Sequence, residues 1–321
     1  MLKTRKMLYK NWIYNWLIEK KDYIKESTYA NYSNIIFNHI IPKLGNYKLS
    51  ELNHQIIQSF LLELSKSGRK DNKGGLSEKT IKDITIIIKG SIKKAINENK
   101  IKYMELTFNY PKDNKENKIY ILSKSEQNKI TNYVLDNLSS NNIGLLISLY
   151  YGIRIGELCA LKWNDIDFKK GILKINKTIQ RIYVKDNERN YSKIIITSPK
   201  TKNANREIPI NKGFLEILKK IKTDSNCYIL TGTNKYIEPR TYRKNFNKIL
   251  EKLKIHHFNY HSLRHTFATN CISLGVDYKT VSELLGHANV NITLNLYVHP
   301  RYSQKKKCVD LICKIFQEKV K

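Results

Sequence analysis

Four short segments of the sequence concentrate residues that can act on a phosphate group. They read YGIRIGELCALKWNDID (151–167), SPKTKNANREIPI (198–210), HSLRHTFAT (261–269) and LLGHANVNITLNLYVH (284–299). The reactive groups within them are two arginines, a lysine, two histidines and a tyrosine: Arg154, Lys200, His261, Arg264, His287 and Tyr297. Arginine, lysine and histidine side chains can bind or protonate a phosphate ester, and a tyrosine hydroxyl can attack one.

The two arginines suit the charge that develops at phosphorus. As a nucleophile arrives, negative charge grows on the non-bridging oxygens, and guanidinium groups bind these oxygens in pairs. Arg154 lies among apolar residues and glycines, where a bound anion offsets the cost of burying its charge. His261 and Arg264 are three residues apart and share one face of a helix. His287 follows Gly286 at a predicted turn, where it can donate a third hydrogen bond.

A nucleophile and an acid complete the predicted reaction. A tyrosine hydroxyl with a pKa near ~10 needs a base or a cationic pocket before it attacks, and we assign His261 as the base for Tyr297. The departing 5′ oxygen needs a proton, which a lysine on the connection between two predicted strands can deliver. Lys200 and Lys202 both meet that description. An exposed lysine is otherwise a surface charge or a simple phosphate contact.

Structural interpretations compete with these chemical ones. Tyr297 lies at helical spacing from apolar residues, which is also the pattern of a core tyrosine. His261, His265 and Cys271 resemble a partial zinc site, but no fourth donor follows at a recognised spacing, and we predict no metal. Glu157 either orients the neighbouring arginine or simply pairs with it.

The charge of the chain points to a polyanionic partner. Its 58 Lys+Arg against 28 Asp+Glu give a formal net charge of +30. A biased genome would raise Lys, but it would raise Glu as well, so composition alone does not explain the asymmetry. Nucleic acid is therefore the partner that the composition predicts.

Several protein classes are disfavoured by what the sequence does not contain. The five cysteines are scattered and form no C-x-x-C pair, which favours a reducing cytoplasm over a disulfide framework or a zinc ribbon. No stretch approaches the ~20 apolar residues that span a bilayer, so we predict no membrane partner. Neither a G-x-x-x-x-G-K-[ST] loop nor an acidic metal cluster occurs, and we predict no cofactor.

The apolar pattern predicts a mainly helical α+β chain with two domains. Helical spacing runs from residue 7 to about 100, with Ser50 as a candidate cap, and the polar segment 110–118 marks the boundary. We therefore predict a helical domain at 1–112 and a second domain at 118–321. The second opens with Ser123 and Glu126 at the spacing of a capping box. A small antiparallel sheet is predicted between 172 and 210, and helices follow it.

In order and spacing, the reactive residues resemble the tyrosine recombinase, or phage integrase, family. That family has an arginine in a G-x-R-x-x-E turn, a lysine on a β-hairpin, an H-x-x-R pair, a histidine after L-G and a tyrosine about ten residues later. Matching positions are Arg154, Lys200, His261, Arg264, His287 and Tyr297. The motifs cover residues 120–300, and they favour Lys200 over Lys202.

This resemblance implies a fold, a reaction and an assembly. The implied fold is a helical core-binding domain and a mixed α/β catalytic domain that clamp their partner, double-stranded DNA. The implied enzyme cleaves and rejoins DNA through a 3′-phosphotyrosine to integrate and excise a mobile element, with a possible accessory directionality factor. Four protomers would pair two sites.

The C-terminal tail, from about residue 303, would dock in trans in such an assembly. It carries an apolar stripe at Val309, Ile312, Cys313 and Phe316 that needs a partner. A chromosome-dimer resolvase, a type IB topoisomerase and a non-catalytic DNA-binding protein are the alternatives.

Overall fold

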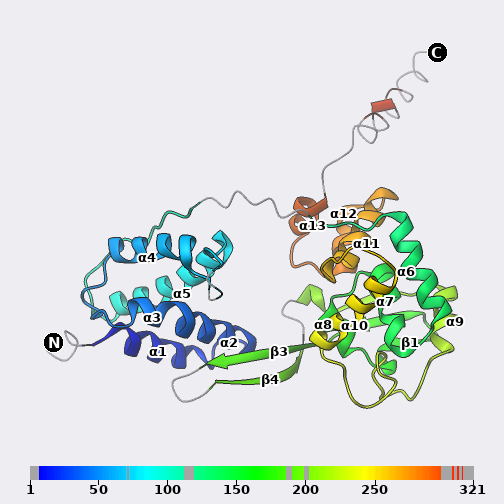
Figure 1. Cartoon of the computed structure of the whole chain (residues 1–321), viewed down its shortest axis with the longest axis horizontal. Coiled ribbons are helices and arrows are strands. Elements are labelled where there is room, and N and C mark those ends of the chain that lie inside the picture. Colours follow the sequence, from blue (N-terminus) through cyan, green and yellow to red (C-terminus); the bar gives the residue numbers. More distant parts are fainter. Residues whose placement is uncertain are drawn as a thin grey trace. The chain divides into compact units, whose positions relative to one another are not determined.

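The computed structural model describes residues 7–69, 71, 73–111, 119–185, 190–198, 202–297, 306, 309, 310 and 313. The residues that lie close to one another in space form two compact units (Figure 1). Unit 1 comprises Met1–Asn117 with Arg181–Ile195, and unit 2 comprises Lys118–Gln180 with Ile196–Lys321. The sequence suggested a single boundary near 112–118, whereas the contacts also assign the segment 181–195 to unit 1.

Unit 1 is a set of helices around an aliphatic and aromatic core. Its helical elements are α1 (Tyr9–Lys20), α2 (Glu26–Ile35), the π-helical η1 (Ile36–Ile40), α3 (Ile41–Leu44), α4 (His54–Ser67) and α5 (Glu78–Asn97). Trp12 and Trp16 are buried one turn apart on α1, as helical spacing requires of an inward face. The cap of α4 is Asn53, whose Oδ1 accepts from the Ile56 N–H at 2.9 Å. The suggestion that Ser50 caps this helix is therefore wrong.

A two-stranded sheet contributes the segment 181–195 to unit 1. Its strands are β3 (Thr178–Lys185) and β4 (Asn190–Thr197). Ile182 and Val184 of β3 form a small buried cluster with Ala30 of α2. The Ser33 hydroxyl of α2 also accepts a hydrogen bond of 3.2 Å from the Lys185 N–H. The end of the hairpin is therefore part of the helical unit (Figure 1).

Unit 2 combines helices with a three-stranded antiparallel sheet of order β1-β2-β5. Its strands are β1 (Ile166–Asp167), β2 (Ile172–Ile175) and β5 (Arg206–Pro209). Its helices are α6 (Lys124–Asp136), α7 (Ser140–Tyr151), α8 (Ile155–Ala160), α9 (Lys212–Lys219), α10 (Pro239–Lys252), α11 (His261–Ser273), α12 (Tyr278–Leu285) and α13 (Val290–Tyr297), with the 3₁₀ turns η2 (Trp163–Asp165) and η3 (Lys202–Ala204). The prediction of a mainly helical chain with small antiparallel sheets is confirmed.

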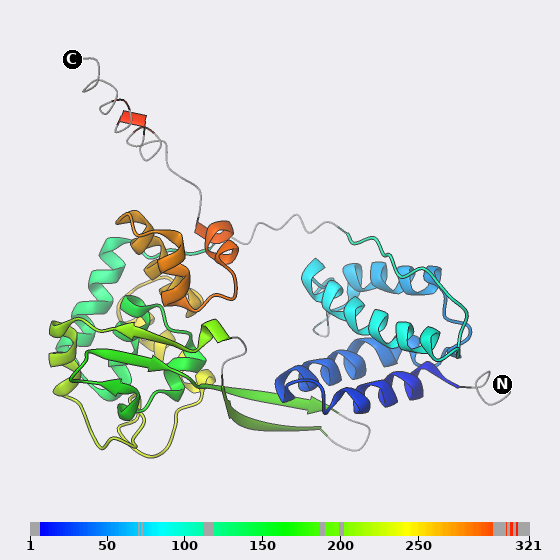
Figure 2. The same cartoon turned by 180° about the vertical axis from the view of Figure 1, so that it is seen from behind.

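Helix α7 forms the centre of unit 2. Every residue from Ile143 to Leu149 is buried, because α6 and α11 both pack against this helix. The Ser148 hydroxyl and the buried Tyr260 hydroxyl share a hydrogen bond of 2.8 Å. Helices α11, α12 and α13 lie together at one end of the unit (Figures 1 and 2). Because α11 packs against α7, the helix that carries the H-x-x-R pair lies beside the centre of the unit.

Two local predictions for unit 2 have different outcomes. Helix α6 begins with the predicted capping box, in which Ser123 and Glu126 each accept from the other's backbone N–H. The strands do not form one sheet, however, because β5 pairs with β2 while β4 pairs with β3. The connection between β4 and β5 therefore joins two sheets and is not the loop of a hairpin.

Candidate active site

A left-handed glycine places the first arginine. Helix α7 ends at Gly152 with φ of 62°, which reverses the chain so that Arg154 precedes α8. A side chain at this glycine would lie 2.5 Å from a Phe267 ring carbon. Arg264 of α11 is 2% exposed, and its Nη1 donates to the Gly152 carbonyl at 2.8 Å. The turn therefore brings the two predicted phosphate-binding arginines to one place.

Arg154 is fixed by a carboxylate and by the end of another helix. Its Nη1 donates to Glu157 Oε1 at 2.8 Å, as the sequence suggested for this pair. Its Nη2 donates to the Gly286 carbonyl at 3.1 Å, and Nη1 also reaches the Leu285 carbonyl at 3.3 Å. These contacts hold a half-buried guanidinium against the turn that carries His287.

Glu157 is buried between two arginines, only one of which the sequence reasoning selected. Arg206 Nη1 and Nη2 donate to the two carboxylate oxygens at 3.1 and 2.9 Å. Burial alone would raise the pKa of Glu157, but the hydrogen bonds and charge of Arg206, together with Arg154, keep that pKa below its ordinary value. The sequence reasoning missed Arg206. A signal did exist: Arg206 lies two residues before Ile208 in the strand REIP, so both side chains point to the buried face of the sheet.

His287 is buried in the turn between α12 and α13. Its Nδ1 shares a hydrogen bond of 2.7 Å with the fully buried hydroxyl of Thr293. Burial, and then the charges of Arg264 and Arg154, lower the pKa of His287 to about 3. The imidazole is therefore neutral at pH 7, with one ring nitrogen protonated.

His261 also carries a neutral imidazole. Desolvation by the surrounding protein, followed by the repulsion that a protonated His261 would meet from His265 and Arg264, lowers its pKa to about 4, although part of the residue remains exposed. The His261 and His265 rings lie perpendicular with centroids 4.7 Å apart. A neutral ring is the form that can accept a proton, as the predicted base must.

The remaining candidates are only partly described. Tyr297 is the last residue of α13, one turn after Thr293. Lys200 lies outside the described residues, and Lys202 begins η3. The zinc interpretation gains no support, because the described part of the chain has no group of three His, Cys, Asp or Glu that could hold a metal ion. Across the same residues, no helix is long and apolar enough to cross a membrane.

Arg154 and Arg264 thus lie beside the turn of His287, which precedes the helix that ends in Tyr297. Arginines grouped in this way suit the transfer of a phosphoryl group. Residues 110–304 match the phage integrase family, and residues 8–65 match the N-terminal SAM-like domain of phage integrases. The chain therefore belongs to the phage integrase family. It is a tyrosine-type site-specific recombinase, an enzyme that breaks and rejoins DNA.

Relatives of known name span most of the chain. A tyrosine recombinase XerC-like protein of Caldanaerobacter subterraneus subsp. tengcongensis is 30% identical over 95% of this chain and 82% of its own length. The ICEBs1 integrase of Bacillus subtilis is 23% identical over 89% of this chain and 77% of its own.

Solved structures share the fold. The Tn1549 transposon integrase in complex with a circular intermediate DNA has a TM-score of 0.74, with 20% identity over 96% of this chain and 100% of that chain. The lambda integrase tetramer bound to a Holliday junction has a TM-score of 0.61, with 21% identity over 89% of this chain and 79% of that chain.

Proposed function

We propose that this recombinase uses Tyr297 to cleave DNA at the ends of a mobile element, so that the element is integrated and excised. The observation that carries the proposal is the junction of Arg154, Arg264 and His287 within unit 2, immediately before the helix that ends at Tyr297. Cationic and hydrogen-bonding groups therefore lie beside α13, the helix that ends in the predicted nucleophile.

The proposed step balances as a transesterification. The Tyr297 oxygen bonds to phosphorus and passes its proton to His261, while the bond from phosphorus to the 5′ oxygen breaks. Lys200 donates a proton to that oxygen, and Arg154 and Arg264 bind the non-bridging oxygens. The energy of the broken bond is kept in the 3′-phosphotyrosine, so a 5′ hydroxyl from another strand can reverse the step without ATP.

The named relatives support a mobile element as the substrate. The ICEBs1 integrase and the Tn1549 integrase both align over most of this chain. A chromosome-dimer resolvase is the second candidate, because the XerC-like relative is the more similar in sequence. In either case we propose that the enzyme acts on cytoplasmic DNA, and an accessory protein could set the direction of an element's movement.

A plasmid assay separates the two candidates. The plasmid carries the coding region's own flanking DNA on both sides of a marker. For an integrase, we expect excision of the marker as a circle, and Tyr297→Phe should abolish it. Recombination between chromosomal terminus sites, with no excision at the flanks, would overturn the mobile-element proposal in favour of the resolvase.

We propose that the helical domain at 1–112 is the core-binding domain and that 118–321 is the catalytic domain. The family matches at 8–65 and 110–304 support this division. The hairpin end at 181–195 would then give the core-binding unit a second chain segment.

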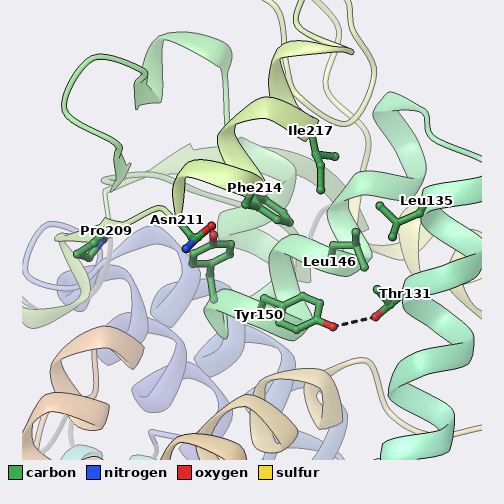
Figure 3. Close-up of a pocket in the computed structure, with 9 residues that line it drawn as sticks. Thr131, Leu135, Leu146, Tyr150, Pro209, Asn211, Phe214 and Ile217 are labelled. Atoms are coloured by element: carbon green, nitrogen blue, oxygen red, sulfur yellow. Dashed lines mark hydrogen bonds between the residues drawn. The ribbon is translucent and has the colours of Figure 1, made fainter.

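We propose a tetramer on two paired sites, with each C-terminal tail docked on a neighbouring protomer. The predicted tail stripe lies largely outside the described residues, although Val309 is exposed. Unit 2 offers an apolar groove of about 480 Å³ that could receive it. Figure 3 shows this groove between α6, α7 and α9, with Leu135, Leu146, Phe214 and Ile217 around it. The Tyr150 and Thr131 hydroxyls share a hydrogen bond of 3.0 Å at its edge.

Truncation after Tyr302 tests the tail. Binding to a single DNA site should be retained, while the assembly of paired sites and recombination should fall. Leu135→Glu, at an exposed leucine that lines the groove, should cause the same defect, and Leu62→Glu, at a similarly exposed leucine of α4, is the control. Normal recombination by the truncated chain would overturn docking in trans. A truncated chain that does not fold would instead show that the tail packs on its own domain.

A further inference from the structure

We propose that Arg206 is a positioning residue for the cleavage step. It sets both the charge and the position of the predicted phosphate-binding group through Glu157, and it fixes the turn of His287 through the backbone. The inference rests on the proposed function and deepens it, because it assigns a role to a buried arginine outside the set of predicted reacting residues.

Arg206 determines the net charge of the group around Glu157. Glu157 is the carboxylate that both Arg154 and Arg206 contact. Two guanidiniums and one carboxylate leave one positive charge, so Arg154 keeps a net attraction for phosphate. Without Arg206, the buried carboxylate would neutralise Arg154 alone. The site would then lose charge stabilisation in the transition state although no phosphate contact had been removed.

Arg206 and Arg154 also bind the backbone at the end of α12. Arg206 Nε donates to the Leu284 carbonyl at 2.7 Å, and Arg154 reaches the carbonyls of Leu285 and Gly286 at 3.3 and 3.1 Å. The last carbonyls of a helix lack partners within it, and here two guanidiniums supply them. The position of the following turn is therefore tied to the position of Arg206.

The segment just before β5 supports the same turn. Asn203, in η3 just before β5, donates through Nδ2 to the carbonyls of His287 and Ala288 at 3.2 and 3.4 Å. Arg206 Nη1 donates to the Ala204 carbonyl at 3.1 Å, which stiffens this connection. Side chains from 203 to 206 thus hold the His287 turn from one side, while Arg154 holds it from the other.

The experiment compares three scissile groups in the full-length protein: phosphodiester, neutral methylphosphonate and phosphodiester with a 5′-bridging sulfur. Arg206→Met should lower single-turnover cleavage of the phosphodiester by roughly 10²-fold, with DNA affinity within about threefold. The deficit should shrink at least tenfold on methylphosphonate, which is neutral before attack and carries one negative charge fewer than the phosphodiester in the transition state. It should persist with the sulfur leaving group, which needs no proton.

Matched variants separate positioning from folding. Glu157→Gln in the Arg206→Met background returns the group to one positive charge and should recover phosphodiester cleavage at least threefold. Arg206→Lys keeps the charge but not the forked contacts, and it should give an intermediate rate. Arg240→Met, at an exposed position of α10, is the control and should cleave like the wild type. The thermal midpoint of each variant reports its folding.

If the wild-type protein forms a covalent adduct with DNA, the proposed function holds, and the results for the Arg206 variants then test the role of Arg206 alone. Equal deficits of Arg206→Met on all three substrates would overturn it and leave a purely structural arginine. Rescue by sulfur alone would overturn it by showing that the defect lies in leaving-group protonation. A wild-type protein without any adduct would instead refute the proposed function.

Discussion

Gly286→Ala should lower both the thermal stability and the cleavage rate. This glycine joins the end of α12, whose carbonyls Arg154 and Arg206 bind, to the turn of His287. Its φ is +63°, and a Cβ there would lie 2.9 Å from the Asn203 carbonyl oxygen and 3.0 Å from Arg206 Nη1. The backbone oxygen must move to admit a methyl group. Gly275 offers a matched control, since its φ is +87° and no atom lies within 4 Å of its Cβ position.

The expected magnitudes separate backbone strain from contact. A left-handed non-glycine residue costs about 1–2 kcal/mol, and this cost applies to both substitutions. Overpacking adds about 1–3 kcal/mol at Gly286 only. One kcal/mol shifts the thermal midpoint of a domain of this size by roughly 2–4 °C. A displacement of the turn by about 1 Å should lower the cleavage rate roughly 10²-fold.

The assay combines thermal unfolding with single-turnover cleavage of a nicked DNA site. Gly275→Ala should lose a few degrees of thermal stability and cleave normally. Gly286→Ala should lose more stability, and its cleavage should fall far more than its DNA affinity. Equal behaviour of the two variants in both measurements would refute the claim that Asn203 and Arg206 closely support this turn.

Three further predictions concern the chemistry directly. Arg154→Ala and Arg264→Ala should each lower the cleavage rate far more than DNA affinity, because their benefit lies mainly in the transition state; a parallel fall would make them ordinary phosphate contacts. Lys200→Ala should be rescued by a 5′-sulfur leaving group in the same cleavage assay, and rescue of Lys202→Ala instead would identify the other lysine as the acid. The folded-state pKa of His287 is about 3, below the ordinary 6.5, so the unfolded chain binds its proton first and the free energy of unfolding should fall as pH drops below about 6.5. His287→Gln should flatten that slope in urea unfolding curves, and an unchanged slope would contradict a buried neutral imidazole.

Local patterns in the sequence predicted much of the candidate site. The start of α6, the turn at Gly286 and the pair of Arg154 with Glu157 each depend on residues a few positions apart. Helical spacing likewise placed the H-x-x-R pair on α11. These features are legible because short-range geometry decides them.

Features set by distant partners were not predicted. Arg206 contacts Glu157 across 49 residues of sequence, and its partner could not be read from its own strand. The pairing of β5 with β2 and the packing of the β3–β4 hairpin on α2 have the same cause. In each case the alternation of apolar residues identified a strand, but not the neighbour that covers it.

Mapping the covalent adduct tests the central claim most directly. The protein is trapped on a nicked suicide substrate, digested with trypsin and nuclease, and the peptide that retains a nucleotide is sequenced by mass spectrometry. We expect a 3′-phosphonucleotide on Tyr297, and Tyr297→Phe should bind the same DNA without forming any adduct. An adduct on another residue, or one that persists in Tyr297→Phe, would contradict the proposed mechanism.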